Sequence, residues 1–242
     1  MESITGSPPR VRREVVSFVR RSARMRPQQR RAWQDHRHRF LVSVPRAEAS
    51  TSVAPGAAVD LRAEFGREAA LVVEIGPGTG EVLIPLAQAR PRANLLAFEV
   101  YQPAIASMLA SLAANRLENV RIVQADAVAG LRHLVPAGGI DLLLTFFPDP
   151  WHKARHRKRR LLTPEFADLV ASRMRLEGTW RLATDWEDYA AHMRQVLDAH
   201  PAFRNEHPGG WAPRWESRPV TRFERRGLDA GRQVHDLTYR KL

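Results

Sequence analysis

From about residue 71 onward, short apolar runs alternate with longer segments of mixed polarity. The apolar runs, which predict strands, cover residues 71–75, 94–100, 120–123, 140–147 and 180–184. The segments with helical patterns cover residues 81–89, 103–115, 128–134, 163–176 and 186–199. Because continuous apolar strands separated by helices form a parallel sheet covered on both faces, the pattern predicts an α/β, doubly wound sheet.

The C-terminal part departs from this alternation. After a segment rich in Pro, Gly and Trp, residues 220–225 and 234–239 have strand-like patterns, and we expect them to pair as an antiparallel edge. Another exception lies inside the helix predicted at 81–89, where Pro85 predicts a kink or a late start. The expected sheet is therefore mostly parallel, with an antiparallel C-terminal edge.

The first 45 residues differ from the rest in charge. Eleven arginines lie from Arg10 to Arg39, with Glu14 and Asp35 as the acids among them and few aliphatic residues to bury. This composition predicts an extended or partly ordered basic arm over residues 1–45, followed by one folded domain over residues 46–242. A tail that only aids solubility remains an alternative for the most N-terminal part.

The whole chain is also basic, with 38 Lys and Arg against 26 Asp and Glu and a net charge of +12. This balance favours a polyanionic partner. Cysteine is absent, which excludes disulfides, thiolate metal ligands and a cysteine nucleophile. No run approaches the length of a membrane span and the N-terminus has no apolar core of signal-peptide type, so we expect a cytoplasmic protein without membrane contact. The sequence leaves open whether the protein is a monomer or a homodimer.

A glycine-rich turn, Glu74-Ile-Gly-Pro-Gly-Thr-Gly80, follows the first predicted strand. Such a turn brings the backbone of a doubly wound sheet close to a nucleotide. A dinucleotide-binding fingerprint would place its third glycine at position 81, which is Glu81, whereas the glycines here are Gly76, Gly78 and Gly80. The G-x-G-x-G spacing with a preceding acid is instead the pattern of enzymes that use S-adenosylmethionine (SAM), and it disfavours a nicotinamide-dependent oxidoreductase.

Acidic residues follow the next two predicted strands as well. Glu99 is placed to accept hydrogen bonds from the ribose hydroxyls of SAM, and Asp126 is placed to accept one from the adenine amino group. Each acid has a structural alternative: Glu74 caps the turn, Glu99 is a solvated strand end, or Asp126 caps the following helix. Together with the glycine turn, the three acids predict a SAM site.

The stretch FFPDPWHKARHRKRR, residues 146–160, places a carboxylate, Asp149, at the end of an apolar strand and a cationic run directly after it. A solvated charged loop is the alternative to an RNA contact. His152 and His156 stand four residues apart, but no carboxylate or thiolate nearby completes a metal site, so no metal is expected. The residues that we expect to bind RNA phosphates are Lys153, Arg155, Arg157, Lys158, Arg159 and Arg160.

These motifs resemble the tRNA (guanine-N7)-methyltransferases, the TrmB family, from about Leu71 to the C-terminus. The matching segments are VEIGPGTG, FEVYQPAI, PDPWHKARHRKRRL, TPEF, the Thr184-Asp185 pair and TRFERRG. The segment PDPWHK followed by arginines is far more specific than a glycine turn. The chain departs from the family pattern at Pro77 and Thr79, where bulkier residues are commoner, and at Arg222, where Lys is usual. The resemblance also does not cover the N-terminal arm.

The resemblance implies a class I SAM-methyltransferase (Rossmann-like) fold and methylation of N7 of the variable-loop guanine at tRNA position 46. It implies SAM contacts at Glu74, Glu99, Asp126 and Asp149. It implies tRNA or target-base contacts at Lys153, Asp185, Thr221, Arg222, Phe223 and Glu224.

The chemistry of this reaction narrows the roles of the acids. Guanine N7 carries an in-plane lone pair and no proton, so it needs no strong general base, and catalysis comes mainly from positioning and electrostatics. Asp149 is the first candidate for the catalytic carboxylate. Asp185 and Glu224 are candidates to accept hydrogen bonds from guanine N1 and N2, although Asp185 could instead cap the helix that begins at Trp186. The rival function is an RNA-binding module without catalysis.

Overall fold

The computed structural model describes residues 24–47 and 51–242, so residues 1–23 of the predicted basic arm lie outside the described part. Seven strands of the described residues form one sheet in the order β3-β2-β1-β4-β5-β7-β6. Strands β1 to β5 are parallel, and β7 is antiparallel to both β5 and β6. The strands are β1 Leu71–Ile75, β2 Asn94–Phe98, β3 Val120–Val123, β4 Ile140–Phe146, β5 Met174–Thr184, β6 Phe203–Asn205 and β7 His235–Lys241.

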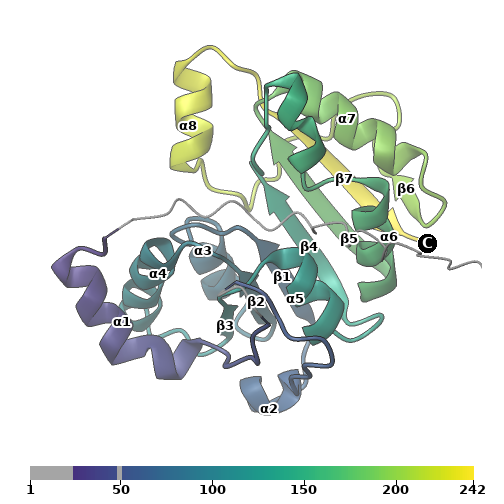
Figure 1. The fold of residues 1–242 in the computed structure, drawn as a ribbon. Helices are drawn as coiled ribbons and strands as arrows, with labels where there is room; N and C mark the ends of the chain where they lie inside the picture. Colours follow the sequence, from purple (N-terminus) through teal and green to yellow (C-terminus); the bar gives the residue numbers. More distant parts are fainter. Residues whose placement is uncertain (1–23, 48–50) are drawn as a thin grey trace, which may run out of the picture.

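Helices cover both faces of this sheet (Figure 1). Neighbouring residues of one strand point to opposite faces: Val72 packs with α1, α3 and α4, and Val73 packs with α2, α5, α6 and α7. The predicted doubly wound sheet with an antiparallel C-terminal edge is thus confirmed. The helices are α1 Pro27–Phe40, α2 Leu61–Phe65, α3 Leu83–Ala89, α4 Gln102–Ala114, α5 Ala127–Leu134, the 3-10 helix η1 Ala154–Arg159, α6 Pro164–Arg173, α7 Glu187–Asp198 and α8 Arg222–Asp229.

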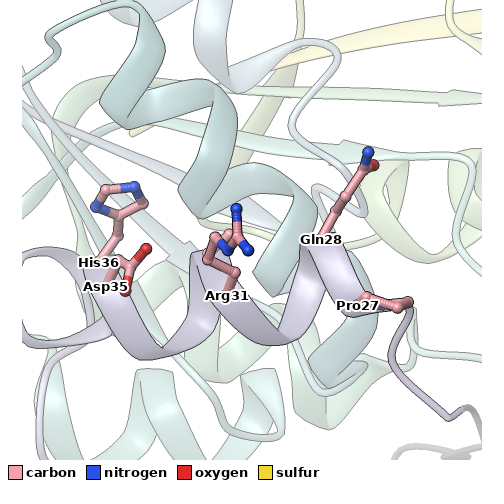
Figure 2. A pocket seen from close by; sticks show the side chains of 6 residues that line it. Pro27, Gln28, Arg31, Asp35 and His36 are labelled. Atoms are coloured by element: carbon pink, nitrogen blue, oxygen red, sulfur yellow. The ribbon is translucent and has the colours of Figure 1, made fainter.

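Helix α1 lies within the basic segment 1–45 and packs on the domain. Gln29 Nε2 donates to Pro103 O at 2.9 Å and to Ser107 Oγ at 3.0 Å, which ties α1 to the first turns of α4. Phe40, at the end of α1, is fully buried. A pocket along the helix is lined by Pro27, Gln28, Arg31, Ala32, Asp35 and His36, and Figure 2 shows side chains of this lining.

Two predictions near the C-terminal edge are wrong: the end of one helix and the type of one element. The helix predicted over 163–176 ends at Arg173, because β5 begins at Met174 and pairs there with Ile140. A Cβ at Gly178 would lie 3.0 Å from Ile140 O, so a glycine permits the two backbones to come this close. The charged residues Arg175 and Glu177 and the following Gly178 interrupt the apolar run that would have indicated this start of the strand.

The strand predicted over 220–225 is the start of helix α8. Thr221 caps this helix, because its Oγ1 accepts the backbone N–H of Glu224 at 3.1 Å. Thr221, Glu224 and Gly227 form its buried face at helical spacing. Strand β7 therefore pairs with β5 and the short β6, and not with residues 220–225. The late start predicted for the helix with Pro85 is confirmed, since α3 begins at Leu83.

A buried ion cluster fixes α8 to β7. Arg218 is fully buried and donates to Glu224 at 2.8 Å and to Asp236 at 2.8 and 3.0 Å. Arg214 also donates to Glu224, at 2.9 Å. Burial lowers the pKa of Arg218, although the charges of both acids oppose that shift. Removing one member of such a cluster leaves a buried charge without a partner, which typically costs about 3–5 kcal/mol.

Candidate functional site

The candidate site lies at the carboxyl ends of the parallel strands, where β1 and β4 are neighbours. The chain leaves β1 toward α3 on one face of the sheet and leaves β4 toward α6 on the other face. In an open α/β sheet this change of direction leaves a crevice outside the strand ends, which is where ligands bind. The glycine turn after β1 and Asp149 after β4 both lie at this crevice.

The three glycines of the turn have left-handed backbone conformations. The φ angles of Gly76, Gly78 and Gly80 are +67°, +58° and +83°, which residues with a side chain rarely adopt. A Cβ at Gly80 would also lie 3.0 Å from side-chain atoms of Ile84 and Met108. A Cβ at Gly76 or Gly78 would meet no atom within 4 Å. The turn therefore leaves open space above its backbone.

Glu99 holds this turn from inside the protein. One carboxylate oxygen accepts the backbone N–H of Gly78 at 2.9 Å, and the other accepts those of Val100 and Tyr101 at 2.8 Å each. Burial raises the pKa of Glu99, the three backbone bonds oppose that shift, and the charge of Asp149 adds to it. Glu99 is thus a buried organiser of the turn and not a solvated strand end.

Glu74 lies buried at the end of β1, and its Oε2 has no hydrogen-bond partner among the described residues. Burial, followed by the charge of Glu99, raises the pKa of Glu74 to about 8. The group is therefore mostly protonated at neutral pH in the free protein. An unpartnered buried carboxyl is costly unless a ligand completes its bonding.

Asp126 follows β3 at the same edge of the sheet. Its Oδ1 accepts the backbone N–H groups of Val128 and Ala129 at 2.9 and 3.3 Å, so it caps helix α5. Its own backbone N–H donates to Thr51 O at 2.7 Å. Asp126 thus caps α5, which was the structural alternative for this residue. Its contact with adenine remains a prediction.

Asp149 stands between two prolines after β4, and its side chain is exposed. Neighbouring atoms still displace part of its hydration, and this desolvation raises the pKa of Asp149. Phe147 and Trp151, on either side of the Pro-Asp-Pro segment, have φ angles of 51° and 44°. Such conformations are strained for bulky residues and concentrate at functional sites.

Asp185 follows β5 and lies against Gly227 of helix α8. Its Oδ2 accepts Arg232 Nε at 2.7 Å, and a Cβ on Gly227 would lie 2.6 Å from the same oxygen. It does not cap α7, since the backbone N–H of Trp186 donates to Thr184 Oγ1 and the N-cap residue makes no side-chain bond. The structure therefore places Asp185 next to Gly227 of α8, with one carboxylate oxygen bonded to Arg232.

The four residues implied at the start of α8 lie in different environments. Thr221 caps the helix, and the side chain of Arg222 bonds to the glycine turn. Phe223 is 63% exposed, whereas Glu224 is 1% exposed and bonded to Arg214 and Arg218. A base contact of Glu224 remains a prediction that its ion cluster does not favour.

The cationic run after Trp151 divides into exposed and internal residues. Lys153, Arg155, Arg157 and Lys158 are exposed, and Arg157 pairs with Asp188 at 2.9 Å. Arg159 stacks over the ring of Trp151 at 5.1 Å.

Arg160 differs from the rest of this run because it is buried. It donates to both oxygens of Asp188 at 2.7 and 2.9 Å and to Pro150 O at 2.9 Å. These contacts attach the segment after β4 to α7. They do not favour the predicted contact of Arg160 with RNA.

Sequence reasoning missed two arginines that arrange this site. Arg232 orients Asp185, and Arg218 holds the cluster behind α8. Both stand in loops among many other arginines, so no local pattern distinguishes them.

The residues at the crevice fit SAM. Its amino group is a cation that matches the unpartnered Oε2 of Glu74, and the open backbone at Gly76 and Gly78 leaves room for it. No group of three or more His, Asp or Glu residues in the described part of the chain is arranged to hold a metal ion. Among the same residues, no helix is long and apolar enough to cross a membrane.

The fold and the site define the class of SAM-dependent methyltransferases. Among solved structures, a 16S rRNA methyltransferase named KamB superposes with a TM-score of 0.54 at 18% identity, covering 74% of this chain and 93% of that one. TrmN from Thermus thermophilus superposes with a TM-score of 0.52 at 17% identity, covering 75% of this chain and 47% of that one. At these identities the likeness concerns the fold alone.

Sequence comparison gives the particular family. Residues 68–237 match a family model described as "Putative methyltransferase". The tRNA (guanine-N(7)-)-methyltransferase of Cutibacterium acnes is 54% identical over 235 residues, 96% of this chain and 85% of that protein. The protein of the same name from Nocardioides sp. is 46% identical over 234 residues, 95% of this chain and 88% of that protein. The chain belongs to the tRNA (guanine-N7)-methyltransferases.

We predict that Glu74 makes the stability of the free protein fall as pH rises. Its pKa is about 8 in the folded protein against 4.5 in a model peptide, so between these values the folded state keeps a proton that the unfolded chain has released. The contribution to the free energy of unfolding should fall with a slope of at most about 1.4 kcal/mol per pH unit, and it is fully lost above the folded pKa.

Urea denaturation of Glu74→Gln and the parent protein at several pH values across this window tests the slope. The variant should gain stability relative to the parent as pH rises, because Gln has no proton to lose. A difference between the two proteins that does not change with pH would show that Glu74 has an ordinary pKa.

Proposed function

We propose that this protein transfers the methyl group of SAM to N7 of guanine in tRNA, at the variable-loop position 46. The observation that carries the proposal is the group of acids Glu74, Glu99 and Asp149 at the carboxyl edge of the sheet, directly beside exposed cations. The relatives named above carry this activity in their names. An RNA-binding module without catalysis would have no use for an unpartnered buried carboxyl such as Glu74.

In this proposal the cofactor lies on the glycine turn. Gly76, Gly78 and Gly80 let it approach the backbone, and Glu74 accepts from its amino group. Glu99 and Asp126 face its ribose and adenine. When bound, SAM supplies a methyl group on a sulfonium centre.

Asp149 is the proposed catalytic residue. Because guanine N7 attacks through a free lone pair, no proton has to leave before the methyl group moves. Positive charge shifts from sulfur onto the purine during the reaction, and a carboxylate at the end of β4 favours that charge electrostatically. The desolvation that raises the pKa of Asp149 also strengthens its interaction with a nearby cation.

Asp185 is the proposed acceptor for guanine N1 and N2. Arg232 donates to one of its oxygens, and Gly227 leaves room for that oxygen, so the other oxygen is available to the base. Preorganised acceptors of this kind select a base by its hydrogen-bonding edge. Phe223, which is exposed on α8, is available to contact the base or its neighbours.

The RNA grip consists of the exposed cations of η1 and the residue before it. Lys153, Arg155 and Lys158 have the exposure that phosphate binding requires, with Arg157 and Arg159 next to them. A tRNA substrate also supports a cytoplasmic location.

The function is tested by incubating the protein with labelled SAM and unmodified tRNA and then identifying the methylated nucleoside. We expect 7-methylguanosine, and no label in a tRNA whose guanine at position 46 is replaced by adenine. Asp149→Asn should lower the single-turnover rate by about 100-fold with little change in tRNA affinity. Asp229→Asn, which removes an exposed carboxylate on α8, serves as the matched control.

Label in another nucleoside would overturn the proposed reaction. A near-normal single-turnover rate in Asp149→Asn, with saturating tRNA and SAM, would overturn the role of Asp149 alone.

The RNA grip is tested by the salt dependence of tRNA binding. Replacing Arg155 and Lys158 together with Gln should reduce the slope of log affinity against log salt by about 1.4–1.8, because each lost phosphate contact contributes roughly 0.7–0.9. The affinity for SAM should not change. Arg92→Gln with Arg175→Gln is the control, since these exposed arginines lie near the amino ends of β2 and β5. An unchanged slope in the first variant would remove η1 from the RNA surface.

A further inference from the structure

The first residue of α8 bonds to the glycine turn, although 141 residues of sequence separate them. The backbone N–H of Arg222 donates to Glu81 Oε2 at 2.6 Å, and its guanidinium Nη2 donates to Thr79 Oγ1 at 2.7 Å. Arg222 Nε forms an ion pair with the same Glu81 carboxylate. Figure 1 shows α8 apart from the other helices, above α3 and α4 in this view. The bonds of Arg222 link α8 to the turn that precedes α3.

The contacts hold the turn at the two residues that flank Gly80. Burial alone would raise the pKa of Glu81, but the backbone and side-chain bonds from Arg222 lower it, so Glu81 is ionised at neutral pH. Glu99 holds the same turn from the inside through the N–H of Gly78. The turn is thus fixed from one side by β2 and from the other by α8.

The opposite face of α8 determines the position of Asp185. Gly227 leaves space for the Asp185 carboxylate, and the backbone N–H of Arg232 donates to Gly227 O at 2.9 Å while its side chain bonds Asp185. One short helix therefore contacts both the cofactor turn and the proposed base acceptor. A displacement of α8 would move both contacts together.

We infer that Arg222 is a positioning residue that couples the cofactor turn to the target-base site, so that SAM and tRNA each strengthen the binding of the other. The inference rests on the proposed function. Arg222 bonds to Thr79 and Glu81 through its backbone and side chain, and the next residue, Phe223, has an exposed side chain. Coupling of this kind is reciprocal: the factor by which tRNA raises cofactor affinity equals the factor by which the cofactor raises tRNA affinity.

The experiment measures the affinity of S-adenosylhomocysteine, which cannot donate a methyl group, with and without saturating tRNA transcript. The parent protein should bind it at least about fivefold more tightly with tRNA present. In Arg222→Gln this ratio should fall toward one, whatever the change in the affinity without tRNA. Glu81→Gln should have the same effect from the side of the turn.

Two further variants isolate the pair. The double variant Arg222→Gln with Glu81→Gln should lose no more of the ratio than either single variant, because both remove one interaction. Arg225→Gln removes an exposed arginine of the same helix, and it should keep the parent's ratio whatever it does to tRNA affinity. Melting temperatures show that each variant is folded.

A parent ratio of one, or a parent-like ratio in both Arg222→Gln and Glu81→Gln, would overturn the inference. Failure of the proposed function is recognised separately, because the parent protein would then produce no 7-methylguanosine in tRNA.

Discussion

Two carboxyl groups buried beside each other at the carboxyl ends of β1 and β2 set the conditions for the rest of the site. Glu99 is stabilised by three backbone N–H groups and in return fixes the glycine turn. Glu74 has no donor for Oε2, and the charge of Glu99 adds to its desolvation, so it keeps a proton. Buried apolar side chains of both core layers surround the strands and cause this desolvation. A cationic ligand group is the natural partner of such a pair.

Some arginines of the chain stabilise the fold, whereas others are exposed and available to a partner. The net charge does not distinguish these two groups. Arg160 and Arg218 are buried with carboxylate partners and hold segments of the fold together. Arg222 and Arg232 join α8 to the glycine turn and to Asp185. The exposed cations around η1 remain for a polyanion. A basic composition thus indicates the kind of partner, whereas burial and pairing decide which cations are available to it.

Much of the fold followed from the sequence because the strands at the centre of a parallel sheet are continuous apolar runs. The first four predicted strands and the helices between them are present with small shifts at their ends. The predictions failed where tertiary contacts overrule the local pattern. β5 begins at Met174, which pairs with Ile140 in a stretch interrupted by charged residues, and α8 exposes Phe223 while it buries Glu224. Apolar periodicity cannot identify a helix whose buried face is a threonine, a glutamate and a glycine.

For the site, the sequence located the strand ends and their acids but not their partners. Motif spacing places Glu74 near the end of β1 and Glu99, Asp126, Asp149 and Asp185 after the next four strands, and the topology brings them to one edge. The cap formed by Asp126 and the pairing of Asp185 with Arg232 depend on geometry that spacing does not contain. The bond between Arg222 and the glycine turn is of the same kind, because its partners lie far apart in the chain.

The central claim is that the cation of the cofactor completes the bonding of Glu74. Calorimetry of SAM binding at neutral pH, in buffers with different ionisation enthalpies, counts the protons exchanged. Because Glu74 has a pKa of about 8 in the free protein and should ionise against the amino group of SAM, binding should release about one proton, and Glu74→Gln should abolish this release. The account would be contradicted if the parent protein bound SAM without releasing a proton, or if Glu74→Gln still released one.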